Sequence, residues 1–420
     1  GQDRERSRGL LRRRVYARRR AVVDQQGTIQ CVFCRHLRLE GGVGAIAARE
    51  RIAAERLTFV RLRHRCGFAI FAGAMEQTRP IDGLRCLVTG SAGFVGSSLV
   101  RALLARGCEV HGFDKAEAPF EDPNLRWFCG DVRSAADLRE ACEGVDTVFH
   151  TAAMIETLTY APATFAELVR SVNVDGTRNV VRVAEDSGAS RLVHTSSIIT
   201  VPPEQRSGGG ESADYSSAKD LYSTTKVASE QLVLGANGRS GLLTTAVRPG
   251  GIYGPGERKT FIGPLMTSLK QGAPLVVFGD GSTLMDYTYI DNLVDAQLRA
   301  AERLVEGSPV CGQAYIVTDG APINTGAFSS TLIRDTGIDA RSIRIPGLVA
   351  RALATAGERV FQVFGKPKPP VSVVEVNLCI NDSYFSISRA KQDLGYEPLV
   401  DTREGLRRTA VDARKYYESL

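Results

Sequence analysis

The sequence predicts an α/β protein built on a doubly wound parallel sheet, and three observations point to this fold class. From residue 84 onward, short apolar stretches typical of buried strands alternate with longer helical stretches. A set of closely spaced glycines joins the first of these strands to the first helix. The composition, with 43% hydrophobic and 24% charged residues, is that of a globular protein and excludes collagen-like or largely disordered chains.

The charge is distributed unevenly along the chain. Residues 1–79 hold 18 arginines, no lysine and 7 acidic residues, a net charge of +11. Residues 80–420 hold 35 basic and 40 acidic residues, a net charge of −5. Because the body of the protein is acidic, we expect no nucleic-acid partner. No apolar run reaches the roughly 18 residues of a transmembrane helix, so none is predicted.

The N-terminal segment, residues 1–79, shows little helical or strand periodicity. We therefore expect a disordered or non-native extension, with Met75 as the natural start. Its candidate zinc ligands lack a second pair at the usual spacing, so no metal site is predicted: they are Cys31, Cys34, His36 and Cys66. The nine cysteines of the chain are scattered and odd in number, which favours free thiols in a reducing, cytoplasmic compartment.

The strand predicted over residues 84–89 runs into the glycine-rich turn. Gly90 permits a tight turn, Gly93 lets the backbone approach a pyrophosphate, and Gly96 lets helix and strand pack closely. The helix that follows, to Arg106, would offer free N–H groups to the phosphates. This strand–turn–helix context predicts a Rossmann-type dinucleotide-binding site.

The next predicted strand ends in an acid, Asp114, 18 residues after Gly96. A carboxylate there can accept hydrogen bonds from both hydroxyls of the adenosine ribose and would repel a 2′-phosphate, which favours NAD over NADP. Lys115 beside it leaves NADP open, and the alternative role for Asp114 is that of a simple turn residue. Further along, Asp131 is placed to meet the adenine amino group.

A buried strand is predicted over residues 147–153, running out to Ala152 and Ala153 beside the cofactor. His150 lies near its end next to small residues. A histidine in such a position is more often structural than catalytic, so we assign it no chemistry.

The catalytic chemistry is predicted from a tyrosine and a lysine spaced by four residues. Tyr222 and Lys226 would share one face of a helix, where the lysine would lower the pKa of the phenol. The tyrosine could then exchange a proton with a substrate oxygen that Ser197 holds in position. Tyr215 and Lys219 have the same spacing, but the helix predicted after Tyr222 is longer and better patterned, so we favour Tyr222.

Residues 84–417 resemble the extended short-chain dehydrogenases/reductases, a family with a Rossmann fold. The motifs that carry the resemblance lie at residues 89–96, 131–132, 173–177, 197, 222–226 and 248–255. The resemblance implies that Ser197 orients the substrate oxygen, Tyr222 is the acid/base and Lys226 holds the nicotinamide ribose and tunes Tyr222. It implies that Asn173 supports the lysine through water, and that the protein is a homodimer. The implied cofactor contacts are Gly90, Gly93, Phe94, Val95, Gly96, Asp114, Asp131, Val132, Ala152, Ala153, Tyr222, Lys226 and Pro249.

Within that family, the sequence is similar to the 3β-hydroxysteroid dehydrogenase and sterol-4α-carboxylate 3-dehydrogenase branch. Sugar-nucleotide enzymes carry an arginine where this chain has Met285, so their phosphate-binding group is absent. The resemblance implies hydride transfer at a secondary alcohol of a lipophilic substrate, with decarboxylation where a 4α-carboxylate is present. The alternatives are a nucleotide-sugar epimerase, a long-chain β-keto acid reductase, and a non-catalytic dinucleotide-binding sensor or scaffold.

The predicted organisation is an extension over residues 1–79, a cofactor domain over 80–250 and a smaller, discontinuous substrate-binding portion over 251–420. Residues 343–364 have apolar side chains on one helical face. Ordinary packing of this face onto the substrate portion is one interpretation. The other is that the face forms the wall of a lipophilic pocket or makes peripheral contact with a bilayer.

Overall fold

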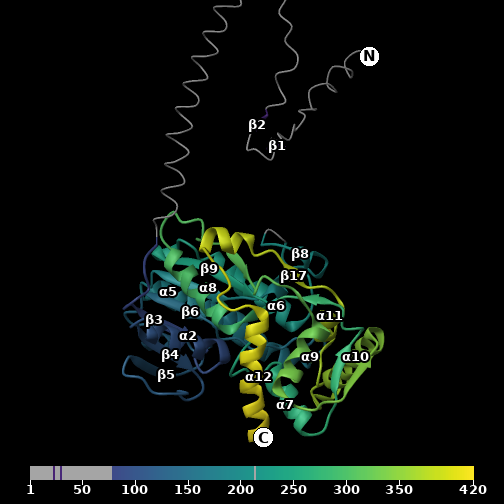
Figure 1. Cartoon of the computed structure of the whole chain (residues 1–420). Helices are drawn as coiled ribbons and strands as arrows, with labels where there is room; N and C mark the ends of the chain where they lie inside the picture. The colour runs from purple at the N-terminus through teal and green to yellow at the C-terminus, as the bar shows by residue number, and fades with distance from the viewer. Residues whose placement is uncertain (1–21, 24–28, 31–77, 212–213) are drawn as a thin grey trace, which may run out of the picture. The chain divides into compact units, whose positions relative to one another are not determined.

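The computed structural model describes residues 22–23, 29–30, 78–211 and 214–420 (Figure 1). The chain divides into two units, Gly1–Ala72 and Gly73–Leu420. In the first, β1 (Val22–Val23) pairs antiparallel with β2 (Ile29–Gln30). The predicted extension and the four candidate zinc ligands fall almost wholly outside the described residues.

A seven-stranded sheet forms the centre of the second unit, and every neighbouring pair in it is parallel. In spatial order its strands are β14 (Ala314–Val317), β9 (Leu243–Pro249), β7 (Arg191–Thr195), β6 (Thr147–His150), β3 (Arg85–Thr89), β4 (Glu109–Asp114) and β5 (Leu125–Cys129). The order reverses between β3 and β6, as in dinucleotide-binding folds. This confirms the predicted doubly wound α/β fold.

Helices cover both faces of this sheet (Figure 1). Because side chains alternate along a strand, Val88 of β3 contributes to one apolar core and Leu87 to the other. The first core includes residues from α2 (Phe94–Ala105), α8 (Ile290–Arg303) and α12 (Thr402–Ser419). The second includes residues from α3 (Ala135–Ala141), α5 (Gly176–Asp186) and α6 (Leu221–Leu234).

Beyond the large sheet, the described chain forms short two-stranded pairs and peripheral helices. The pairs are β10 (Gly251–Tyr253) with β13 (Tyr287–Tyr289), β12 (Leu284–Met285) with β15 (Ile323–Asn324), β11 (Leu275–Phe278) with β16 (Ser342–Ile345), and β17 (Tyr384–Phe385) with β8 (Ser207–Gly209). The other α-helices are α4 (Ala163–Arg170), α7 (Ile262–Lys270), α9 (Thr325–Thr336), α10 (Gly347–Phe364) and α11 (Val373–Ile380).

Strand β14 pairs with β9, so a segment far beyond residue 250 belongs to the large sheet. The domain boundary at residue 250 itself stays a prediction. Within the described parts of the chain, no helix is both long and apolar enough to cross a membrane.

Candidate active site

In the glycine-rich turn, the backbones of Gly90, Gly96 and Ala152 lie close together with no side chain between them. Gly90 has a positive φ of 75°, and a Cβ atom there would lie 2.8 Å from the backbone of Ala152. A Cβ atom on Gly96 would lie 2.1 Å from the carbonyl oxygen of Gly90. Gly93 stands immediately before α2, and Phe94 and Val95 open the helix. This cradle, which any larger residue would fill, fits the pyrophosphate of a dinucleotide.

Asp114 ends β4 beside this cradle. Its carboxylate accepts hydrogen bonds from the backbone N–H of Ala92 in the glycine turn (3.0 Å) and of Ala116 in its own turn (3.1 Å). The carboxylate is half-buried, and each oxygen keeps a lone pair for a further donor. The geometry therefore gives Asp114 the local role of a turn residue and also the position expected of a ribose ligand.

Asp131 lies next to two cations. Arg133 binds its carboxylate at 2.6 Å and Lys115 at 3.2 Å. The hydrogen bond from Arg133 has the largest effect on the pKa of Asp131, and together with Lys115 it holds this pKa well below its usual range. Burial alone would raise the pKa, but its effect is smaller. The side chain of the next residue, Val132, is buried against Gly176 of α5.

His150, at the end of β6, has both ring nitrogens engaged. Nδ1 lies 2.7 Å from the hydroxyl of Thr89 and Nε2 lies 2.9 Å from the hydroxyl of Thr177. Burial lowers the pKa of His150 to about 3, so the ring is uncharged at neutral pH. These contacts support the structural role expected for this residue, and the chain continues from it to the half-buried Ala152 and Ala153.

Tyr222, Lys226 and Ser197 come together at the carboxyl edge of the sheet. The side chain of Asp220 caps α6 by accepting the N–H of Ser223 at 2.8 Å, which starts the helix immediately before Tyr222. Lys226 follows one turn later. Ser197 follows β7 and starts a short 3₁₀ turn, and its hydroxyl lies close enough to the phenol of Tyr222 to lower the pKa of that phenol.

The electrostatics of this group differ from the sequence expectation. Burial raises the pKa of Tyr222 to about 12, and the hydrogen bond from Ser197 opposes that shift only partly. Burial also lowers the pKa of Lys226 to about 8, and its ammonium donates to the carbonyl oxygen of Thr195 at 2.5 Å. The lowering of the phenol pKa expected from Lys226 is absent: the ammonium of Lys226 is hydrogen-bonded to Thr195, and Ser197 is the group that lowers the pKa of the phenol.

Asn173 lies in a π-helical turn, Ser171–Asp175, between α4 and α5. Its side-chain amide accepts the N–H of Met154 (2.7 Å) and donates to the carbonyl of Met154 (2.9 Å) and to the hydroxyl of Thr225 (3.0 Å). Turns of this kind are frequent at functional sites. Asn173 thus connects the loop after β6 to the residue beside Lys226, while its water-mediated support of the lysine stays a prediction.

The second tyrosine–lysine pair is arranged differently. Tyr215 and Lys219 lie outside any helix, so their spacing does not place them on one face. The ring of Tyr215 lies against the guanidinium of Arg248, 5.5 Å from the ring centre, and Arg248 forms a buried ion pair with Glu230. Tyr215 therefore belongs to a structural cluster, and Lys219 is exposed.

The model of the 3-beta hydroxysteroid dehydrogenase/isomerase family matches residues 87–347. The chain belongs to this family. This confirms the resemblance stated from the motifs.

Its curated relatives include two bacterial proteins and one human protein. A 3-beta-hydroxysteroid dehydrogenase of Mycolicibacterium neoaurum is 36% identical, covering 82% of this chain and 94% of the relative. A 3 beta-hydroxysteroid dehydrogenase/Delta 5→4-isomerase of Mycobacterium tuberculosis is 39% identical, covering 80% and 91%. The human sterol-4-alpha-carboxylate 3-dehydrogenase, decarboxylating, is 34% identical, covering 81% and 91%.

Solved structures share the fold of this 3β-hydroxysteroid dehydrogenase family member. MoeE5 in complex with UDP-glucuronic acid and NAD has a TM-score of 0.62 at 25% identity, covering 80% of this chain and 100% of that one. The dTDP-glucose 4,6-dehydratase DesIV of Streptomyces venezuelae, with NAD and TYD bound, has a TM-score of 0.63 at 24% identity, covering 80% and 97%.

One residue that the sequence analysis missed links α10 of this family member to the site. The buried carboxylate of Glu358 accepts the N–H groups of Thr159 (2.9 Å), Tyr160 (2.8 Å) and Val373 (2.7 Å). The neighbouring carbonyl of Leu158 accepts the N–H of Leu221 (3.0 Å), which precedes Tyr222. The sequence does contain a signal for this residue, because Glu358 is the single acidic residue in the otherwise basic stretch 344–368.

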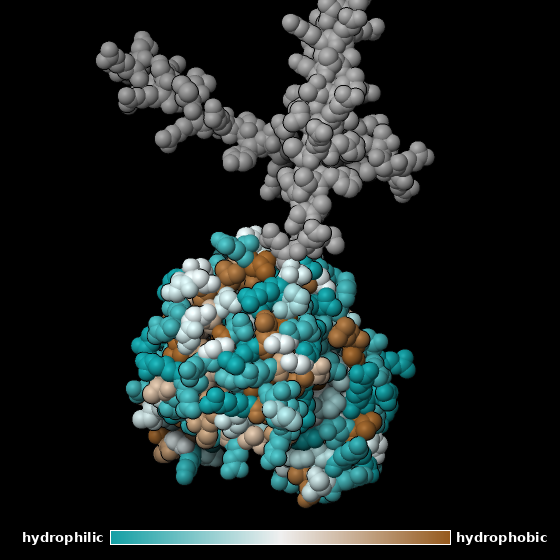
Figure 2. Space-filling model, turned by 90° about the vertical axis from the view of Figure 1, so that its left-hand side faces the viewer, coloured by the Kyte–Doolittle hydropathy of each residue, from teal (hydrophilic) through white to brown (hydrophobic). Residues whose placement is uncertain are grey.

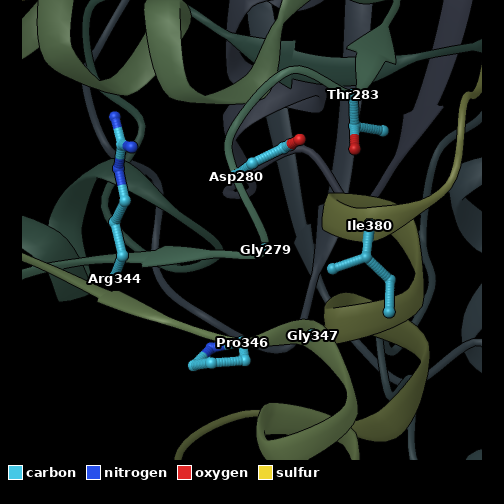
Figure 3. Close-up of a pocket in the computed structure, with 7 residues that line it drawn as sticks. All are labelled: Gly279, Asp280, Thr283, Arg344, Pro346, Gly347 and Ile380. Carbon is cyan, nitrogen blue, oxygen red and sulfur yellow. The ribbon is translucent and has the colours of Figure 1, made fainter.

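A cavity of about 550 Å³ lies beside the start of α10 and is shown in Figure 3. Its lining is Gly279, Asp280, Thr283, Arg344, Pro346, Gly347 and Ile380. None of these is a predicted catalytic or cofactor-binding residue. Among the residues that the structure describes, no cluster of three or more His, Cys, Asp or Glu side chains could hold a metal ion.

Proposed function

We propose that this chain is an NAD-dependent oxidoreductase that transfers hydride between the nicotinamide and a secondary alcohol carbon of a 3β-hydroxysteroid or sterol. The observation that carries the proposal is the convergence of Ser197, Tyr222 and Lys226 at the carboxyl edge of the sheet. The glycine cradle at the same edge supplies the place for the dinucleotide.

In this proposal the chain's own residues bind, orient and move one proton. The glycine turn and Asp114 hold NAD, which when bound accepts or supplies the hydride. Ser197 donates a hydrogen bond to the substrate oxygen, and Tyr222 removes its proton during oxidation or returns it during reduction. Lys226, whose ammonium the carbonyl oxygen of Thr195 accepts, would hold the nicotinamide ribose.

The substrate class is inferred from the relatives and from one position in the chain. The relatives are named for 3-beta-hydroxysteroids and sterol-4-alpha-carboxylates. The side chain of Met285, half-buried and close to Gly251, stands where sugar-nucleotide enzymes carry a phosphate-binding arginine. An uncharged thioether there suits an apolar molecule. With a 4α-carboxylate, the new ketone accepts the electrons of the breaking carbon–carbon bond, so decarboxylation needs no further residue.

The nucleotide-sugar epimerase is the second candidate, and what favours it is the similarity of the fold to enzymes that act on nucleotide sugars. A long-chain β-keto acid reductase and a non-catalytic sensor stay as further alternatives. We place the protein in the cytoplasm, in keeping with the cysteines that the structure describes, which are free: Cys86, Cys108, Cys129, Cys142, Cys311 and Cys379.

The test is a substrate panel with a matched pair of variants. The protein should reduce NAD with a 3β-hydroxysteroid or a 4α-carboxysterol and show no turnover of UDP-sugars. Tyr222→Phe should lose turnover by about 100-fold or more while keeping NAD affinity, because it removes the positioned acid/base. Tyr215→Phe, the control, should stay near wild type. Turnover of a UDP-sugar alone, or reversed effects of the two variants, would overturn the proposal.

A further inference from the structure

Helix α10 packs onto the protein with one face and presents an apolar face to solvent. The inward residues are Ala350, Ala354, Glu358 and Phe361, all buried. The outward apolar residues recur every three or four positions: Val349, Ala352, Leu353, Ala356, Val360, Val363 and Phe364. Leu353, Val363 and Phe364 are 62%, 72% and 74% exposed. The apolar face predicted from the sequence is therefore not the face that packs.

The surroundings of this apolar stripe are positively charged. Between residues 344 and 368 the basic residues are Arg344, Arg351, Arg359, Lys366 and Lys368, and all are exposed. The single acid, Glu358, is buried and turned inward. Because residues 80–420 carry a net charge of −5, this concentration of basic residues is a local exception. Lys368 is partly neutralised by Glu156, at 2.6 Å.

We propose that α10 docks on an anionic lipid bilayer, with its apolar stripe in the interface and the surrounding basic residues on the headgroups. An exposed apolar stripe flanked by cations is the pattern of helices that lie in a membrane surface. A second copy of the chain fits less well, since pairing two such faces would bring their basic residues together. The coloured, described residues of the face in Figure 2, which is turned 90° from the view of Figure 1, are mainly hydrophilic with separate hydrophobic areas.

The position of α10 connects this surface to the site. Figure 1 shows α10 at the edge of the molecule away from β3, β4 and β5. Through Glu358 the helix holds the backbone of Thr159 and Tyr160, and the adjoining Leu158 holds the start of α6. This step rests on the proposed function: docking would deliver a sterol from the bilayer to the side of the site that α10 supports.

The docking is tested by vesicle co-sedimentation of the full chain, independently of activity. We expect binding to phosphatidylcholine vesicles containing about 30 mol% phosphatidylglycerol, and weaker binding to pure phosphatidylcholine or at high salt. Leu353→Glu should reduce the bound fraction at least about tenfold, because it places a charge in the apolar interface. The control is Val411→Glu on α12, a residue of similar exposure (51%) outside the stripe, which should bind as wild type does.

Thermal unfolding and NAD affinity show whether each variant stays folded. Equal binding of Leu353→Glu and wild type, or no preference for anionic vesicles, overturns the docking. A change of oligomeric state in Leu353→Glu without lipid binding by wild type assigns the stripe to a second copy instead. Vesicle binding that persists when no sterol is turned over would leave the docking standing and would reject the proposed function alone.

Discussion

Tyr222, Ser197 and Lys226 meet because β7 ends, and α6 begins, at the same edge of the sheet, although residues 196–220 separate the two elements in the sequence. Lys226 lies close to the buried, stacked rings of His150 and His194, whose centres are 5.2 Å apart. Burial and the nearby lysine lower the pKa of both histidines, so neither ring carries charge at neutral pH. Lys226 is thus the cation of this buried group, and its protonation bears on both stability and chemistry.

The stability of the protein should depend on pH through Lys226. Its pKa is about 8 in the folded protein against an ordinary value of 10.5, so the unfolded chain holds this proton more tightly. Unfolding therefore takes up a proton between about pH 8 and about pH 10.5, and the contribution of Lys226 to the free energy of unfolding rises with pH across that window. Below about pH 8 the full penalty of the buried charge is present.

The measurement is denaturant unfolding of wild type and Lys226→Met from about pH 7 to about pH 10. Other titrating groups cancel in the difference between the two proteins. We expect wild type to gain on the variant by up to ~1.4 kcal/mol per pH unit above about pH 8. A difference that does not vary with pH would contradict the low pKa of Lys226.

Asp114 should determine the preference for NAD. Asp114→Ala removes both the ribose acceptor and the charge that repels a 2′-phosphate, so the ratio of kcat/KM for NAD to that for NADP should fall by roughly tenfold or more. Steady-state kinetics with both cofactors measure this ratio. Asp122→Ala is the control, since Asp122 has a comparable turn contact with the N–H of Asn124 (2.9 Å) away from the glycine turn. An unchanged ratio in Asp114→Ala would make it a turn residue only.

At the scale of elements, α10 illustrates where a sequence pattern stops. The helical pattern was predicted over residues 343–364, but Ser342–Ile345 form β16, paired with β11, and the helix begins at Gly347. The boundary follows from Pro346, because the residue before a proline favours extended backbone. Periodicity identified the apolar face of the helix. It did not show what the opposite face contacts, because that face is held by the three backbone N–H groups that donate to Glu358.

Replacing Glu358 by glutamine should weaken the connection between α10 and the site. The NH₂ group of the glutamine would face a backbone N–H that now donates to the carboxylate, and two donors cannot bond to each other. The free energy of unfolding should therefore fall by about 2 kcal/mol. Because Thr159 and Tyr160 would lose their anchor, the KM for a sterol should rise while the Kd for NAD stays unchanged.

Denaturant unfolding, sterol kinetics and NAD titration in the absence of vesicles check this. Arg351→Gln on the same helix is the control, because Arg351 is exposed and lies about two turns before Glu358. Equal effects of Glu358→Gln on NAD and sterol would point to general loss of structure instead of loss of the anchor.

At the scale of the whole molecule, the family resemblance predicts a homodimer. Sedimentation of the protein without lipid should give twice the 45.4 kDa mass of one chain. Since the α10 stripe is proposed to face lipid, Leu353→Glu should leave this mass unchanged. A monomer at micromolar concentration would contradict the dimer, and a monomer formed by Leu353→Glu would place the interface on α10.

Local sequence patterns were enough to predict the sheet, the glycine turn and the motif residues. Alternating strands and helices and the glycine spacing depend on local geometry, which is written in neighbouring residues. For this reason the predicted strands at residues 84–89 and 109–114 agree with β3 and β4. The choice of Tyr222 over Tyr215 agrees with the helix that begins at Leu221, although its role in catalysis stays a prediction.

The surroundings of those residues, in contrast, depend on tertiary packing. The direction of the Tyr222 pKa shift depends on burial, and burial depends on segments far apart in the chain. The contacts of Asn173 with Met154 and Thr225, and of Glu358 with the loop before α4, likewise join residues that no local pattern relates. Which face of α10 remains in solvent was settled by the same long-range packing, because periodicity defines a face but not its neighbour.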